Sequence, residues 1–224
     1  MLNCKLMHAP LPPVAAALVL ASAGLAQDLP KVMTKIIVQA DGRSIPQGAT
    51  LRQPRVIYRA GAGYCRVEES VEEGSGLQEL LIIREPDVWV VNLSDRKGRH
   101  SLDPGPVLDC HLPIFSGPPP GSADKTDYLR LGLEFGGELA FFRKMGAVAQ
   151  TGPVLQSKET TSYILEREGT RLALFTYGPD QHPLLLARTT ARSEELYWYS
   201  GYGQLPFDAD LFTVPRGIDI VEQR

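Results

Sequence analysis

The chain has few of the residues that bind metal ions or act as nucleophiles. It holds three cysteines and four histidines among 224 residues. Beyond residue 26 the histidines are His100, His111 and His182, each in a different segment, and HxH, CxxC and HExxH spacings are absent. A Gly-x-Ser-x-Gly elbow, a P-loop and a dinucleotide-binding fingerprint are missing as well. We therefore predict a protein that is not an enzyme and that holds no metal ion and no cofactor.

An excess of positive charge is also missing. The chain has 23 Lys and Arg against 26 Asp and Glu, a formal net charge of −3. Without residues 1–26, which contain Lys5 and no acidic residue, the balance is 22 against 26, or −4. Proteins that bind nucleic acids usually carry a basic surface that neutralises phosphates. We therefore expect no nucleic-acid partner.

Long hydrophobic runs are absent, because no segment reaches the roughly 18 uninterrupted apolar residues of a membrane helix. The mature chain is thus expected to have no transmembrane segment. The first 26 residues have the charge of Lys5, a short apolar run from Val14 to Leu20, and small residues at Ala21-Ser22-Ala23 or Gly24-Leu25-Ala26. This pattern predicts that residues 1–26 are a signal peptide and that the mature chain is periplasmic in a Gram-negative cell. An uncleaved N-terminal anchor is the alternative.

Two cysteines, Cys65 and Cys110, remain in the predicted mature chain. In an oxidising compartment an isolated pair of this kind favours a disulfide bond. Two buried thiols on separate strands are the alternative. An exported cysteine with a partner is a poor candidate for a nucleophile.

Residues 27–224 have the length of a single domain with one sizeable core. Short apolar segments alternate with turn residues, as in Leu77 to Ile83, Val88 to Leu93 and Arg99 to Leu102, which predicts antiparallel hairpins. The clearest helical stripe lies in Tyr128 to Ala147, although two glycines weaken it. The predicted fold class is α+β: a curved antiparallel sheet of about 9–11 strands covered by one or two helices.

The end of the chain resembles a known family. An aromatic strand, Tyr197-Trp198-Tyr199, precedes the acidic, proline-bounded segment from Leu205 through Leu211-Phe212 to Pro215 and Gly217. This pattern is similar to that of the LolA/LolB-like superfamily of exported bacterial proteins, which includes the carriers of outer-membrane lipoproteins. The resemblance implies a half-barrel whose concave apolar face is covered by helices and holds acyl chains. It implies a lipid or a lipoprotein acyl chain as partner, or an envelope protein.

Apolar side chains with strand or helix spacing are candidates for the lining of such a cavity. Alternation along strands places Trp89, Val91 and Leu93 on one face, and Leu196 with Trp198 on one face. The candidates on the predicted helix are Phe141 and Phe142. For all seven, ordinary core packing is the alternative interpretation.

The leading hypothesis is a periplasmic protein that is not an enzyme and that binds a lipid, a lipoprotein or another apolar ligand in the concave face. The alternative is a structural or signalling module of the cell envelope with a filled core, which binds a protein partner. A third hypothesis is an envelope hydrolase, because Asp109 and His111 would share one face of a strand.

Overall fold

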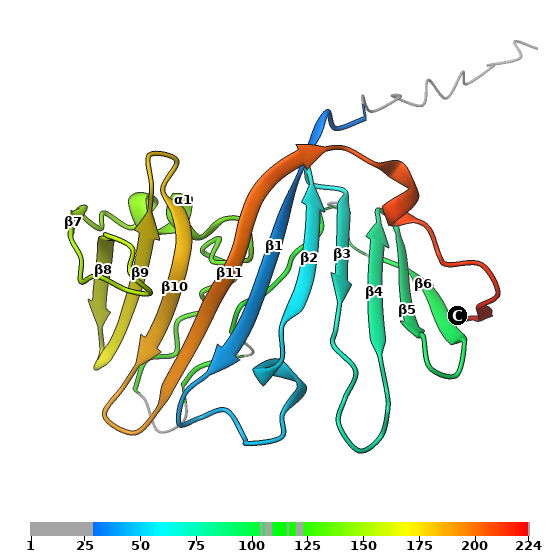
Figure 1. Cartoon of the computed structure of the whole chain (residues 1–224), viewed down its shortest axis with the longest axis horizontal. Helices are drawn as coiled ribbons and strands as arrows, with labels where there is room; N and C mark the ends of the chain where they lie inside the picture. Colours follow the sequence, from blue (N-terminus) through cyan, green and yellow to red (C-terminus); the bar gives the residue numbers. More distant parts are fainter. Residues whose placement is uncertain (1–28, 104, 106–108, 116, 120–122, 224) are drawn as a thin grey trace, which may run out of the picture.

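The computed structural model describes residues 29–103, 105, 109–115, 117–119 and 123–223, so the predicted signal peptide lies outside the described residues. The described residues form one curved, open sheet of 12 strands (Figure 1). Its strands are β1 (Val32–Asp41), β2 (Arg55–Ala60), β3 (Tyr64–Glu68), β4 (Glu79–Arg84), β5 (Asp87–Asn92), β6 (Lys97–Leu102), β7 (Gln150–Thr151), β8 (Thr161–Arg167), β9 (Thr170–Tyr177), β10 (His182–Thr189), β11 (Glu194–Pro206) and β12 (Asp219–Glu222). A helix α1 (Glu138–Lys144) and two 3₁₀ helices, η1 (Thr50–Arg52) and η2 (Ala209–Phe212), complete the elements of the described residues.

The sheet consists of two antiparallel meanders joined at β1. The strand order is β12-β6-β5-β4-β3-β2-β1-β11-β10-β9-β8-β7. The meander from β2 to β6 has the predicted short turns between β4, β5 and β6, and the meander from β8 to β11 follows the helix. Strand β12 pairs with β6 in parallel, whereas the other pairs are antiparallel. The described residues contain 12 strands, one more than the upper end of the predicted range of about 9–11, and the strands at the two edges, β7 and β12, are short.

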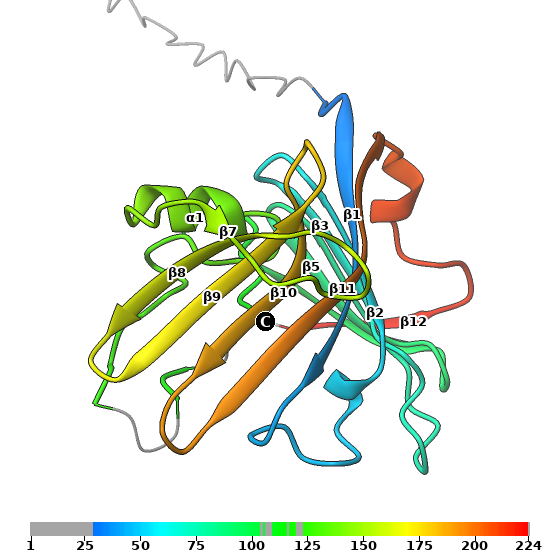
Figure 2. The same cartoon turned by 60° about the vertical axis from the view of Figure 1, so that its left-hand side comes forward.

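Each face of the sheet has its own core. The face that we call concave, where α1 lies (Figure 2), packs against the described residues between 110 and 147, which we call the covering segment. The opposite, convex face packs against the C-terminal segment from Phe207 to Ile220, which includes η2. Side chains of β1 alternate between the two faces and so contribute to both cores. Met33 belongs to the convex cluster, and Ile36 and Val38 belong to the concave one.

The predicted helix from Tyr128 to Ala147 is wrong over most of its length. The α-helix spans only Glu138–Lys144. Gly132 and Gly136 have φ angles of +95° and +88°, which a right-handed helix does not allow, so the residues before Glu138 form turns. Leu129 and Leu133, which have helical spacing, therefore lie in a folded loop. One short helix and irregular backbone, and not helices alone, cover the concave face.

The predicted disulfide is confirmed. Cys65 in β3 is bonded to Cys110, and their Cα atoms are 6.3 Å apart. Both residues are buried in the concave core. The bond therefore fastens the beginning of the covering segment to the middle of the sheet. Within the described parts of the chain, no helix is long and apolar enough to cross a membrane.

Candidate functional site

A groove of about 350 Å³ lies on the concave face over strands β2 to β5. Four aliphatic side chains form its floor: Ile57, Val67, Leu81 and Val90, which we call the apolar row. Each is the direct cross-strand partner of the next, so all four share one face. Three strand spacings of about 4.8 Å make the row about 14 Å long. The groove therefore has the elongated, apolar floor that an alkyl chain requires.

The apolar row becomes more exposed from the middle of the sheet toward its edge. Ile57 is completely buried and Val67 is 7% exposed, whereas Val90 is 37% exposed. Leu81 is half-buried. The groove is thus closed at the β2 end and open at the β5 end. The two ends of the groove therefore differ in their exposure to solvent.

The covering segment forms the wall of the groove beside the row. Leu112, Pro113 and Phe135 line this wall. The Phe135 amide donates a hydrogen bond of 3.0 Å to the Leu112 carbonyl, and Pro113 and Glu134 form an isolated β-bridge. Together with the disulfide at Cys110, these bonds hold the wall against the sheet. The wall is therefore a fixed part of the fold.

Polar side chains border the opposite side of the row. Arg55 forms an ion pair of 3.2 Å with Glu69, and its guanidinium lies 5.8 Å from the centre of the Phe135 ring. Glu79 lies beside them at the rim. The Arg55 Nε and Glu69 Oε2 atoms are buried without a hydrogen-bond partner among the described residues. The groove therefore has a polar border on one side of the apolar row and an apolar wall on the other.

The rest of the concave face is filled by aromatic side chains. Phe135 packs edge-on against Tyr197 at 6.0 Å between ring centres, and Phe141 packs in the same way against Phe142 at 5.5 Å. The Tyr199 hydroxyl donates a hydrogen bond of 2.9 Å to the buried carboxylate of Glu138. Burial raises the pKa of Glu138 to about 7.

The structure does not bring the seven predicted cavity residues together. Phe141 and Phe142 are buried in the concave core. Trp89, Val91 and Leu93 lie on the convex face, where they contact the C-terminal segment. Leu196 and Trp198 are half-buried and belong to neither buried cluster, because their neighbours Tyr197 and Tyr199 take the inward positions of β11.

Sequence reasoning missed the apolar row. In β5 the residues that face the groove alternate with the predicted ones, so Val90 points to the concave side and Trp89 to the convex side. The larger aromatic side chain directed the prediction to the face that packs against the C-terminal segment. A signal was present in the sequence, since Leu81 and Val90 are aliphatic residues on successive predicted strands, but their face depends on the whole sheet.

Asp109 and His111 lie near each other, as the hydrolase hypothesis requires, but within an ion-pair network. The His111 Nε2 atom is 3.9 Å from Asp109 Oδ2, and its Nδ1 atom is 3.3 Å from Glu134 Oε2. Glu134 in turn pairs with Arg59 at 2.9 Å. The adjacent Cys110 is in the disulfide, so its sulfur is no thiolate nucleophile. The described residues contain no group of three or more His, Cys, Asp or Glu that could hold a metal ion.

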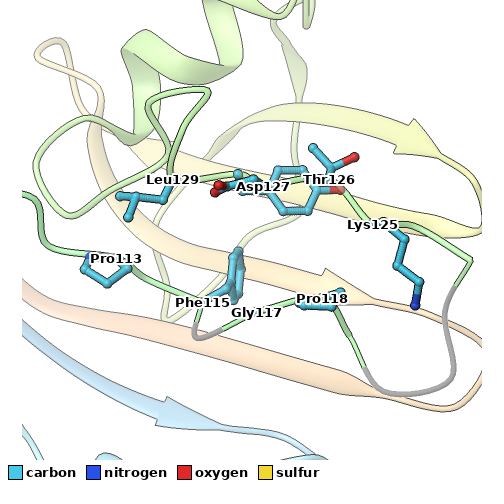
Figure 3. Close-up of a pocket in the computed structure, with 9 residues that line it drawn as sticks. Pro113, Phe115, Gly117, Pro118, Lys125, Thr126, Asp127 and Leu129 are labelled. Carbon is cyan, nitrogen blue, oxygen red and sulfur yellow. The ribbon is translucent and has the colours of Figure 1, made fainter.

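A second cavity, of about 470 Å³, lies between two parts of the covering segment (Figure 3). Phe115 and Pro118 lie on one side of it, and the backbone from Lys125 to Leu129 runs along the other. The guanidinium of Arg188 lies 4.0 Å from the centre of the Phe115 ring. One of its lining residues, Gly117, is next in the sequence to a residue that the structure does not describe. The groove over the apolar row, whose lining is fully described, is therefore the candidate site.

Comparisons with known proteins identify no family for the chain. No protein-family model matches it, and a search of curated proteins found no match. Among solved structures, the chain is similar to an uncharacterized conserved protein from Thermus thermophilus, with a TM-score of 0.47 and 13% sequence identity. The similarity covers 85% of this chain and 90% of that one.

Proposed function

We propose that the groove binds an acyl chain, and that the protein is a periplasmic, non-enzymatic binding protein of the LolA-like type for a lipid or a lipoprotein. The observation that supports this proposal is the apolar row, an unbroken line of aliphatic side chains in register across four strands. Val90, at its open end, keeps 37% of its surface exposed. An alkyl chain in the groove would remove this apolar surface from water, which stabilises a complex by about 0.8 kcal/mol per buried CH₂.

The first test is the mass of the protein as it leaves the cell. The full chain is exported in a Gram-negative host, purified without detergent and measured by native mass spectrometry. A carried ligand would add mass that solvent extraction removes. A bare polypeptide would count against a ligand that stays bound through purification.

The second test places a charge in the groove. Val90→Asp puts a carboxylate on the apolar row at a position that tolerates exposure, and Val154→Asp is the matched control at a site with 66% exposure outside the groove. Binding is measured by the fluorescence of a hydrophobic dye and its displacement by decanoate. We expect Val90→Asp to weaken decanoate binding at least tenfold, or about 1.4 kcal/mol, and the control to bind like the wild type. Equal binding by both variants, or no binding by the wild type, would refute the proposal.

A filled core favours a second candidate function, the envelope module that binds a protein partner. Phe141 and Phe142 of α1 are buried in the core of the concave face and do not line the groove. In this case the wild type would carry no lipid and would bind no dye. Chemical cross-linking in intact cells would then identify a protein joined to the folded domain.

A further inference from the structure

The line of the apolar row continues beyond β5 onto a cationic residue. Val90 pairs directly with Arg99 of β6, and Arg99 pairs with Val221 of β12. Direct partners on neighbouring strands share a face, so Arg99 stands on the concave face at the open end of the row. Its side chain is exposed. Four aliphatic residues are therefore followed, in the same line and toward solvent, by a guanidinium group.

A second cation lies beside Arg99. Lys97 is two residues earlier on β6 and hence on the same face, about 6.6 Å away along the strand; its side chain is exposed. Neither side chain has an ion pair or a hydrogen bond with the described part of the chain. By strand register, two carboxylates are nearest to Lys97. Asp219 of β12 is its direct partner on one side, and Glu79 of β4 pairs with Asn92, its direct partner on the other side. Glu222 is instead held by His100, at 2.6 Å from its Nδ1 atom, on the convex side.

The two ends of the row differ in a way that sets the direction of a ligand. At the closed end, Ile57 is fully buried, and the nearby Arg55 is already paired with Glu69. At the open end, Arg99 is exposed and unpaired among the described residues. A methyl terminus fits the closed end, where a charge would lose its water. An anionic head fits the open end, where a guanidinium offers two parallel hydrogen bonds to a carboxylate.

We propose that the groove selects a single-chain fatty acid, with its alkyl chain along the apolar row and its carboxylate on Arg99. The apolar row is a single line of four side chains between Glu69 on one side and Leu112 on the other, which matches one extended alkyl chain. Lys97 adds positive potential beside the head. This inference rests on the proposed function and adds to it the class of the ligand and its orientation.

The experiment compares two probes of equal chain length on three proteins. Decanoate and decanol are titrated at pH 8, below their aggregation limits, into the wild type, Arg99→Gln and Arg96→Gln, with dye displacement as the readout. Arg96→Gln removes the same charge from the turn of the same hairpin, outside the row. Exposed ion pairs are weak, so we expect Arg99→Gln to weaken decanoate binding about three- to fivefold. Decanol binding should not change, and added salt should reduce the preference for decanoate.

The outcomes separate this inference from the proposed function. If decanoate and decanol bind equally, or if Arg99→Gln and Arg96→Gln have the same effect, the role of Arg99 is refuted while the acyl groove stands. If neither probe binds the wild type, both proposals fail. If decanoate binding falls only in Arg99→Gln and decanol binding is kept, the ligand class and its orientation are supported. Circular dichroism of each variant checks that the fold is intact.

Discussion

A buried carboxylic acid should make the stability of the protein depend on pH. Glu138 opens α1 and is only 1% exposed. Its Oε1 atom accepts hydrogen bonds from the Tyr199 hydroxyl, at 2.9 Å, and from the Gly136 amide, at 3.0 Å. Its Oε2 atom is buried without a partner among the described residues. Burial raises the pKa of Glu138 from 4.5 to about 7, and the positive charge of Arg59 opposes this shift.

The sign of the effect follows from proton binding. Between about pH 4.5 and pH 7 the folded protein keeps a proton on Glu138 that the unfolded chain releases. The free energy of unfolding therefore falls as the pH rises through this window. The difference between the two pKa values corresponds to about 3 kcal/mol. Glu138→Gln resembles the protonated acid and should lose this part of the pH dependence.

The measurement is urea unfolding of the wild type and Glu138→Gln at pH 5 and pH 8. We expect the wild type to lose about 3 kcal/mol more than the variant between the two pH values. Glu168→Gln is the control, because this carboxylate is 52% exposed in its side chain, and it should follow the wild type. A parallel pH dependence of the wild type and Glu138→Gln would show that Glu138 does not titrate in this range and would refute the reasoning.

Two further predictions concern the covalent and backbone frame. The disulfide between Cys65 and Cys110 closes a loop with a sequence separation of 45. In the loop-entropy model, replacing both cysteines by Ala should lower the free energy of unfolding by up to about 4 kcal/mol. A loss below about 1 kcal/mol in urea unfolding would contradict this prediction. Gly42 has a φ of +116°, and an added Cβ would lie 2.2 Å from a carbonyl oxygen of β11, so Gly42→Ala should cost about 2 kcal/mol or more. Gly203→Ala, with open space around it, should cost under about 1 kcal/mol, and equal thermal stability of the two variants would disprove the argument.

The local features of the fold could be predicted from the sequence, because hairpins depend on short-range patterns. The segment from Val88 to Leu93 was predicted as a strand, and β5 spans Asp87–Asn92. The turn at Pro86 separates it from β4 as expected. The helix prediction was wrong for a local reason as well. The leucine spacing from Leu129 onward is helical, but Gly132 adopts a positive φ.

The candidate site depends on long-range features that no local pattern contains. Alternation correctly puts Trp89 and Val91 on the same face. That this is the convex face, covered by the C-terminal segment, is evident only from the folded chain. Arg99 reaches the end of the apolar row through the register of β5 with β6. The basic hairpin that contains Arg99 is visible in the sequence. Its position at the end of the apolar row opposite Ile57, which lies three strands from Val90, follows only from the strand order of the assembled sheet.

Binding of an acyl chain to the apolar row can be observed by NMR of methyl-labelled protein titrated with decanoate. We expect concentration-dependent shifts of the Val67, Leu81 and Val90 methyl groups, with the methyl groups of Val154, outside the groove, unchanged. Shifts that avoid the row, or that involve Val154 as strongly as Val90, would contradict this expectation.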